Sequence, residues 1–490
     1  MNAIQIHPGD TVAVALSPLS GGTSVLGVIL TEDIPQGHKF ALQDIPSGAD
    51  IQKYGLPIGH ATRDISAGEH VHTHNVKTNL AEDAVYTYEP VKAAIPAPDG
   101  PVPVFQGFRR ANGRAGIRNE IWIIPTVGCV NAVAQKIAAL TSCEIRGSVS
   151  GVYAFPHPYG CSQLGDDHAN TRRLLASLCH HPNAGGVLVL GLGCENNAIA
   201  GMQEEIGAYD AARLKFLCCQ ESGNEIEDGA ALVRELIAAA ADDRREPLPV
   251  SQLVVGLKCG GSDGLSGITA NPAVGRFSDM LIGFGGSTIL TEIPEAFGAE
   301  TLLMNRAVSR EVFDETVAAV NWFKHYFVSH GQVVYENPSP GNKAGGITTL
   351  EDKSCGCIQK SGSMPLVGVL PYGERIRSAG LNLLYGPGND LVSSTALTAA
   401  GANLILFTTG RGTPFGAPAP TVKISTNSAL AARKGSWIDF NAGTAAEGES
   451  LDSVARRLFD YVIRVANGEE TSTERLGARE LAIFKDGVTL

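Results

Sequence analysis

From about residue 105 to the C-terminus, short apolar runs alternate with segments of helical spacing. This alternation is typical of parallel sheets in an α/β architecture. One helical segment ends at Asn467-Gly468, a favourable C-terminal stop. We therefore predict buried strands over 121–127, 186–192, 214–218, 253–257, 288–293, 366–370, 404–408 and 422–425, and helices over 226–241, 310–329 and 451–466.

The first 80 residues follow a different pattern. A turn that opens with Asp and closes with Gly occurs at 33–37, 44–48 and 64–68. Pro or Ser lies inside each turn, and Gly supplies a positive φ. Short strand-like runs such as 25–30 lie between the turns. We predict a small, turn-rich β domain over 1–80.

Five prolines between residues 90 and 103 indicate an extended, semi-rigid linker over 81–105. The linker carries the β domain, which can then lean over another domain. About 385 residues follow, enough for two α/β units at roughly 150 residues per domain. A polar, proline-containing seam at 244–249 divides them into a middle domain over 106–246 and a C-terminal domain over 247–490.

The composition excludes several classes of protein. The net charge is −12 and the pI is about 5.5, whereas nucleic acids and anionic membranes require a basic surface. Residues 1–10 lack the basic region and apolar stretch of a signal peptide, so we expect none there, and no apolar run reaches the ~18 residues of a membrane span. Ten cysteines are too few for a disulfide scaffold. We expect a cytoplasmic protein with reduced thiols and with no nucleic-acid or membrane partner.

Cysteines follow three of the predicted strands. Similar runs place Cys129, Cys194 and Cys259 just past a carboxyl strand end, where open α/β sheets bind ligands. Thiolates select iron or zinc, but no C-x2-C zinc pattern is present. Alternatively, such thiols are inert core residues, and this is our interpretation of Cys143, Cys179, Cys218 and Cys219. The remaining metal candidates in glycine-containing segments are Cys161, Cys355 and Cys357.

Two further groups could carry chemistry. Glu292 ends a predicted strand beside Pro294, where a buried carboxylate is costly unless it is paired or bound to metal. Its roles would be iron ligand, base or simple helix cap. His70, His72 and His74 share one face if that segment is extended. They would bind metal or act as acid and base, or form an exposed polar strand face.

Four arginines lie within residues 109–118. Arg109 and Arg110 could clamp a carboxylate, or the segment could be a solvated loop or a subunit contact. Glycine-rich loops at 338–346, 385–390 and 409–414 match neither the Walker nor the dinucleotide pattern. They are interpreted as backbone cradles for a small anion, with Lys343 and Arg411 as counter-charges, or as ordinary surface turns.

Several motifs together resemble the altronate/galactarate dehydratase family. The resemblance runs from about residue 4 to residue 490, and its motifs lie at 68–75, 109–113, 125–129, 159–168, 191–197, 259–264 and 345–354. It implies a SAF-like β-clip over 1–80 and an extended linker over 81–105. It also implies a middle domain over 106–246 that forms a homodimer, and a Rossmann-like C-terminal variant over 247–490 that carries the metal.

The implied activity is loss of water from a sugar acid, with D-altronate giving 2-dehydro-3-deoxy-D-gluconate. The chain length and segment 478–485 favour altronate over galactarate. The family's activity is linked to Fe2+ under reducing conditions, and Mn2+ is a second choice of metal. Dehydration removes the C2 proton and the C3 hydroxyl, so it needs a base, an acid and a metal that stabilises the enediolate.

We accordingly assign roles by hypothesis. Iron would be bound by Cys259, Glu292 and Cys357, with Cys161 and Cys194 as the next candidates. His72 and His74 would supply acid–base catalysis, with Lys343 also in the catalytic group. The substrate would be held by Arg109, Arg110, Asn342 and Arg411.

Three alternatives stay open. Converging thiolates could hold an iron–sulfur cluster with one open iron instead of a mononuclear ion. The substrate could be a related acid such as galactarate, whose second carboxylate would need a second cationic clamp. The chain could also be a non-catalytic sugar-acid binding protein, in which the thiols, histidines and Glu292 are incidental.

Overall fold

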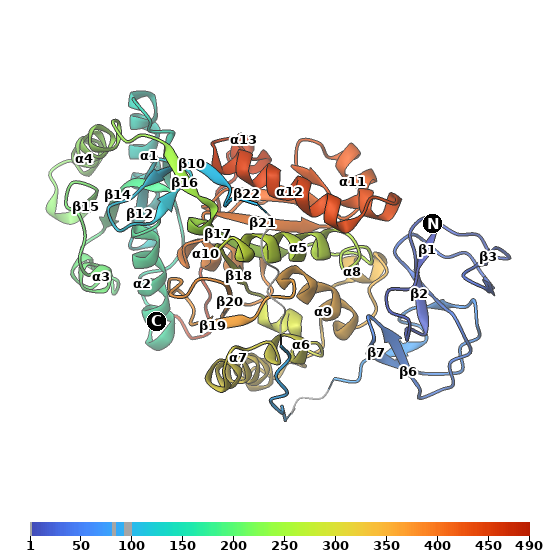
Figure 1. The fold of residues 1–490 in the computed structure, drawn as a ribbon. Coiled ribbons are helices and arrows are strands. Elements are labelled where there is room, and N and C mark those ends of the chain that lie inside the picture. The colour runs from blue at the N-terminus through green and yellow to red at the C-terminus, as the bar shows by residue number, and fades with distance from the viewer. Residues whose placement is uncertain (1, 81–84, 93–99) are drawn as a thin grey trace.

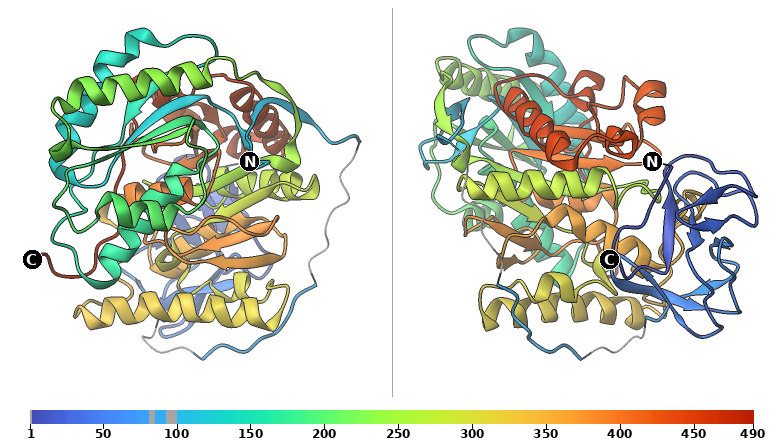
Figure 2. Two further views of the ribbon diagram at one scale, coloured as in Figure 1. Left: turned by 90° about the vertical axis from the view of Figure 1, so that its left-hand side faces the viewer. Right: turned by 45° about the vertical axis from the view of Figure 1, so that its right-hand side comes forward.

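The computed structural model describes residues 2–80, 85–92 and 100–490, so segments 81–84 and 93–99 of the predicted linker lie outside the described residues. The β domain and the middle domain lie at opposite ends of the C-terminal domain (Figure 1). The two views of Figure 2 agree with this arrangement. None of the helices in the described ranges has the length and apolar character to cross a membrane.

The β domain has short antiparallel strands and no helix among residues 2–80, as the turn pattern predicts. Gly37, Gly48 and Gly68 close the repeated turns with φ of 81°, 80° and 85°. One sheet has the order β1-β2-β5-β8 and a second has β6-β7-β9, with β3-β4 as a hairpin. The bounds are β1 Ala3–Ile4, β2 Val12–Ala15, β3 Ser24–Val25, β4 Val28–Ile29, β5 Lys39–Ala41, β6 Asp50–Lys53, β7 Leu56–Ala61, β8 His70–Val71 and β9 Val76–Lys77.

The middle domain is built on a parallel sheet of order β13-β12-β14-β15. Its strands are β12 Glu120–Pro125, β13 Gly151–Ala154, β14 Ala184–Gly191 and β15 Leu214–Cys218, and its helices are α1 Asn131–Thr141, α2 Gly165–Cys179, α3 Ile199–Ile206 and α4 Glu225–Ala240. α1 and α4 cover one face of this sheet, and α2 and α3 pack together on the other.

The junction between the two α/β units is a strand pair. β10 (Val104–Arg109) pairs with β11 (Ala115–Gly116) and with β16 (Glu246–Pro249). The boundaries expected at 105/106 and 246/247 therefore fall inside β10 and β16. β10 leads into the middle domain and β16 leads out of it, and the two strands satisfy each other's backbone hydrogen-bonding groups. The proline-rich composition of both segments did not indicate this pairing.

The C-terminal domain has a seven-stranded parallel sheet of order β19-β20-β18-β17-β21-β22-β23. The chain passes from β17 towards one edge and then returns to β21 on the other side of β17. The strands are β17 Val254–Cys259, β18 Ser287–Leu290, β19 Leu366–Leu370, β20 Leu381–Leu384, β21 Leu404–Thr409, β22 Thr421–Ser425 and β23 Phe440–Asn441. This crossover puts a ligand-binding position at the carboxyl ends of β17 and β21.

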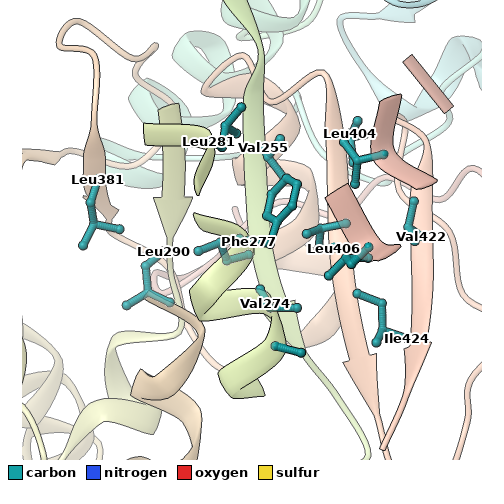
Figure 3. Close-up of a cluster of buried hydrophobic side chains, with 14 of the residues drawn as sticks. Val255, Val274, Phe277, Leu281, Leu290, Leu381, Leu404, Leu406, Val422 and Ile424 are labelled. Atoms are coloured by element: carbon teal, nitrogen blue, oxygen red, sulfur yellow. The ribbon is translucent and has the colours of Figure 1, made fainter. Parts of the chain in front are cut away.

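Helices cover both faces of that sheet. Figure 3 shows Val274, Phe277 and Leu281 of α5 packed against the sheet. α10 packs on the opposite face. The helices are α5 Ala270–Gly283, α6 Thr301–Met304, α7 Arg310–Ser329, α8 Pro340–Ala344, α9 Leu350–Ile358, α10 Asp390–Ala399, α11 Ser428–Arg433, α12 Leu451–Ala466 and α13 Ser472–Leu476.

The predicted α/β class with parallel sheets is confirmed, and each predicted strand and helix after residue 105 corresponds to an observed element. The prediction for 288–293 is wrong at its end, because β18 stops at Leu290. Glu292 then adopts a left-handed conformation with φ of 67°. That conformation is uncommon for a non-glycine residue and turns the chain away from the sheet.

Candidate active site

A cluster of buried thiols, carboxylates and ammonium groups lies at the carboxyl end of β17. Cys259 is the last residue of β17, and Glu295 lies in a 3-10 turn (Ile293–Ala296) after β18. Cys357 comes from the last turn of α9, and Lys360 from the 3-10 turn Gln359–Ser361 that follows it. The four side chains are no more than 4% exposed. The fold thus brings three distant segments together in a water-poor site.

Three of these groups could hold a metal ion. The Sγ atoms of Cys259 and Cys357 are 3.6 Å apart, and Glu295 Oε2 is 3.7 Å and 4.0 Å from them. Their donor atoms all lie within 4.8 Å of one another. The hydrogen bond from the Cys357 thiol lowers the pKa of Cys259. Two sulfurs and one carboxylate oxygen suit a first-row transition metal such as iron or zinc.

Lysines compensate the negative charges. Lys353 Nζ is 2.9 Å from Glu295 Oε1, and Lys360 Nζ is 3.0 Å from Cys357 Sγ. Burial alone would lower the pKa of Lys360, but the Cys259 and Cys357 sulfurs and Glu292 raise it well above its usual value. Lys360 therefore remains an ammonium group, as a buried cation does only when anions surround it.

Glu292 lies beside the donor set rather than inside it. Lys258 forms an ion pair with its Oε1, Lys360 Nζ lies 2.9 Å from its Oε2, and the Cys259 backbone N–H donates to Oε2 at 3.1 Å. Both carboxylate oxygens are thus used by protein donors. The structure favours Glu295 over Glu292 as the third metal-binding group, and leaves Glu292 to position Lys258, Lys360 and Cys259.

The β domain docks on this site through a buried carboxylate. Asp352 of α9 accepts Lys39 Nζ at 2.8 Å on Oδ2 and Lys53 Nζ at 2.8 Å on Oδ1. Burial alone would raise the pKa of Asp352, but the two ammonium groups outweigh burial and hold it well below its usual range. The backbones also meet closely: a Cβ added to Gly264 would lie 1.9 Å from the Gly37 carbonyl oxygen.

Four histidines gather at the same docking surface. His38 Nδ1 is 3.0 Å from His70 Nε2, and the His70 ring stacks on His72 with centroids 5.4 Å apart. The His70 and His74 centroids are 5.6 Å apart. The extended conformation that would place the three rings on one strand face holds only to Val71, where β8 ends in a turn. The three rings gather nevertheless, because the turn brings them back together.

Contacts with α8 fix two of these rings. His72 Nε2 lies 2.9 Å from the Lys343 carbonyl oxygen, and His38 Nε2 lies 3.4 Å from that of Ala344. Burial lowers the pKa of His72 to about 4 and that of His70 to about 3, with their neighbouring cations as lesser causes. Both rings are neutral at pH 7.

A cavity of only about 10 Å³ separates the β domain from the donor set. Lys53 and Tyr54 line it from the β domain, and Lys353 and Cys357 line it from α9. Such a volume is about what one water molecule requires. The β domain therefore covers the site closely in this conformation.

Several predicted site residues lie elsewhere. Cys161 and Cys194 are exposed in the middle domain, and neither is part of the donor group found among the described residues. Arg109 pairs with Glu246, and Arg110 pairs with Asp243 at 2.9 Å. Arg109 and Arg110 thus each pair with a carboxylate near the β10–β16 junction, which accounts for these two arginines without a substrate.

The α8 segment accounts for the other predicted substrate contacts. Asn342 is buried, caps α8 through Ser339 and donates to the Ser262 carbonyl at 2.8 Å. Its amide is therefore occupied within the protein. Lys343 lies next to the histidine contact, and exposed Arg411 approaches the Gly341 carbonyl at 3.4 Å. Lys343 and Arg411 thus lie on the rim of the docking surface.

The lysines and the second acid of the site were not among the residues predicted from the sequence. Lys258, Glu295 and Lys353 each lie within four residues of a predicted ligand. A buried strand that ends in Lys258-Cys259 carries a charge that needs a partner. The need for an acidic partner of Lys258 could therefore have been predicted from the sequence. The pairing of Lys39 and Lys53 with Asp352 could not, because the partners are some 300 residues apart and no local pattern marks them.

Comparison with known proteins identifies the family. The Altronate/galactarate dehydratase SAF domain matches residues 1–79. The second domain of D-galactarate dehydratase/Altronate hydrolase matches 107–241, and the C-terminal domain of D-galactarate/Altronate dehydratase matches 250–489. The three matches follow one another along nearly the whole chain.

Full-length relatives agree. The chain is 54% identical to the altronate dehydratase of Escherichia coli (strain K12) over 100% of both chains, and 54% identical to that of Bacillus subtilis (strain 168) over 99% of both. It is 35% identical to the galactarate dehydratase (L-threo-forming) of Escherichia coli (strain K12), over 98% of this chain and 96% of the relative. The chain belongs to the altronate/galactarate dehydratase family.

Proposed function

We propose that this chain dehydrates D-altronate to 2-dehydro-3-deoxy-D-gluconate and water with the help of Fe2+. The observation that carries the proposal is the 54% identity to two altronate dehydratases over full length, against 35% to the galactarate enzyme. The buried Cys259–Glu295–Cys357 group supports the metal.

The residues present fit a single transition-metal ion. Cys259, Cys357 and Glu295 would hold it, and thiolate donors favour Fe2+ over Mn2+. When bound, the ion would stabilise negative charge on the substrate carboxylate and C2 hydroxyl as the C2 proton leaves. The group has two thiols, fewer than an iron–sulfur cluster usually takes from a protein, which favours a mononuclear ion.

His72 suits the role of the base that takes the C2 proton. Its Nε2 lies against the Lys343 carbonyl, which can only accept a hydrogen bond, so Nε2 carries the proton. The unprotonated Nδ1 accepts from the Thr73 hydroxyl at 3.1 Å, and this exposed hydroxyl would have to turn away before Nδ1 could take a proton. The lowered pKa keeps this ring neutral at pH 7. His74, exposed on the same cluster, would donate a proton to the leaving C3 hydroxyl.

The cations around the site would bind the substrate. Lys343 and Arg411 lie on the rim near α8, where a sugar-acid carboxylate or hydroxyls would enter. Closure of the β domain would exclude water, which strengthens these charge interactions. We also propose a Rossmann-like variant for the C-terminal domain, a homodimer formed by the middle domain, and a cytoplasmic location.

The decisive experiment is anaerobic turnover of D-altronate with ferrous iron and a reductant, followed by 2-keto acid formation. Product that disappears on chelation and returns with iron would support the metal-dependent dehydratase. No product from altronate, with iron demonstrably bound, would redirect the assignment to galactarate. No product from any sugar acid, together with tight metal-free binding, would favour a binding protein.

A variant tests the base. Replacing His72 with Ala should reduce turnover by about 10²- to 10⁴-fold, the usual contribution of a general base, while iron content is unchanged. His60→Ala is the matched control, because His60 belongs to the same domain but bonds only Asn79. Full activity in both His72 and His74 variants would exclude the histidine cluster from catalysis.

A further inference from the structure

A cavity of about 430 Å³ lies at the seam between the middle and C-terminal domains. Arg114 enters it from the turn before β11, Arg173 from α2, and Arg375 from the loop between β19 and β20. All three arginines are half-buried. We call this space the Arg114 cavity. It lies outside the Cys259 cluster, with which it shares no lining residue.

Arg114, Arg173 and Arg375 form no ion pair with any residue that the structure describes. Two carboxylates also line the cavity: Glu374 pairs with Arg377, and Glu205 lies exposed at its edge. Within the described residues, no carboxylate lies within 4.0 Å of the guanidinium of Arg114, Arg173 or Arg375. Arg114 instead donates to the Ile376 carbonyl at 3.0 Å. Burial, followed by the charge of Arg375, lowers the pKa of Arg114, so these cations repel each other.

In two other arginine-lined cavities of this chain, the arginines form ion pairs with carboxylates of the protein. In one of about 280 Å³, the arginines pair with Glu246 and Asp243. In one of about 520 Å³, each arginine has a carboxylate within 3.7 Å: Arg457 with Glu449, Arg464 with Glu469 and Arg475 with Asp439. The chain has 50 acidic residues for 38 lysines and arginines. Among the described residues, the three arginines without an ion pair therefore distinguish the Arg114 cavity from these two.

We propose that the Arg114 cavity binds a small oxyanion with at least two negative charges, of the phosphate or dicarboxylate class. The planar guanidinium presents paired N–H donors that match such oxygens, and three guanidinium groups without an ion-pair partner line this cavity. The volume lies in the range of small-molecule sites. Because its arginines come from both α/β domains, a bound anion bridges them and stabilises the folded chain.

The test is the melting temperature of the full-length protein with added inorganic phosphate, or with succinate, against sodium chloride at equal ionic strength. We expect an increase with at least one of the two dianions that chloride does not produce. The anion that gives the larger increase identifies the class. This readout needs no turnover, so it can fail or succeed independently of the proposed dehydratase activity.

Arg375→Gln and Arg114→Gln keep a polar side chain of similar size and remove one charge. Each should weaken the anion's affinity by about 10- to 100-fold, the usual contribution of a hydrogen bond to a charged group. Arg457→Gln, in the carboxylate-paired cavity, should leave the affinity unchanged. Each variant is compared with itself with and without anion, so a change in basal stability does not obscure the result.

Two results would overturn the proposal. One is an increase no larger than that with chloride, or equal in wild type and in both cavity variants. The other is loss of oligomers in Arg375→Gln by analytical ultracentrifugation without any anion effect, which would assign the arginines to acidic residues of a second copy of the chain.

Discussion

Replacement of Asp352 by Asn removes the charge that holds the β domain on the site. In the native protein the carboxylate meets Lys39 and Lys53 at 2.8 Å each and accepts the Thr348 backbone N–H at 3.0 Å. The carboxylate side chain is 1% exposed, and the two lysine side chains are 2% exposed or less. The amide keeps the volume but leaves two buried ammonium groups without an anion.

Breaking a buried ion pair in this way costs about 3–5 kcal/mol. If that cost falls on docking of the β domain, the ratio of undocked to docked molecules increases by roughly 150- to 5,000-fold. Hydrogen exchange at the Asn79 amide, which donates to Glu351 Oε1 at 2.7 Å across the docking interface, measures the change. Glu449→Gln is the control, because its exposed pair with Arg457 contributes only about 0–1 kcal/mol.

The pH dependence provides a second check on the same reasoning. Burial lowers the pKa of Lys39 to about 8, even with Asp352 and its opposing charge in place. A lysine whose folded pKa lies below its unfolded value binds fewer protons when folded, so stability increases as pH increases between the two values. In Asp352→Asn both lysines lose their anion and this window widens.

The loss of stability in Asp352→Asn, relative to wild type, should therefore shrink as pH increases towards roughly 10.4, the usual lysine pKa, and should begin to shrink below pH 8. Two results would refute the ion-pair account of docking. One is a hydrogen-exchange rate in Asp352→Asn equal to that of wild type at neutral pH, and the other is a loss of stability relative to wild type that does not diminish at high pH.

Two further predictions concern the thiols and acid stability. Cys357→Ser should lower iron content measured by elemental analysis, whereas Cys355→Ser, in the same helix but outside the donor group, should retain it. Stability should fall as pH falls from about 6.5 towards 4, because several buried histidines are neutral when folded and charged when unfolded. The histidines whose lowered pKa values lie near 3 to 4 are His70, His72, His157 and His181. Melting temperatures measured as a function of pH report this loss of stability, and a melting temperature that does not change between pH 6.5 and 4 would contradict it.

Local patterns predicted the elements well because each element has a local cause. The helix at 310–329 begins at a Ser309 cap and matches its predicted range. The cysteine after each buried strand is also a local feature, and it led correctly to the strand end at Cys259. Cys357 was found through its glycine-flanked motif, and the structure brings it to 3.6 Å from Cys259.

Contacts between distant segments were not predictable in the same way. Glu292 was chosen because it follows a strand, and its Oε1 does lie 3.8 Å from Cys259 Sγ. Both of its oxygens are bonded to lysines, however, whereas Glu295 Oε2 lies near both thiols. Arg109 and Arg110 were chosen for their charge, yet their partners are acids more than 130 residues away. Residue type alone does not reveal which partner neutralises a charge.

The small cavity implies that the β domain must move during the reaction. A cavity of about 10 Å³, which is about what a single water molecule requires, cannot admit a six-carbon acid. The chain that follows the β domain is attached to the C-terminal domain, since Tyr88 donates to the Ala307 carbonyl at 3.0 Å and Lys324 donates to Tyr86 at 2.9 Å. This attachment limits how far the β domain can move. While these contacts hold, at most six residue steps join Leu80 to Tyr86, a reach of roughly 20 Å.

Opening should therefore expose Cys357, and alkylation of its thiol in the metal-stripped protein measures how often opening occurs. Mass spectrometry should show slow modification of Cys357 in the wild type and faster modification in Asp352→Asn, because the docking ion pairs are lost. Cys179, buried in the middle domain away from the β domain, should react at the same rate in both proteins. Equal rates for Cys357 in the two proteins would mean that substrate reaches the donor group by another route, and that the β domain is a fixed wall of the site.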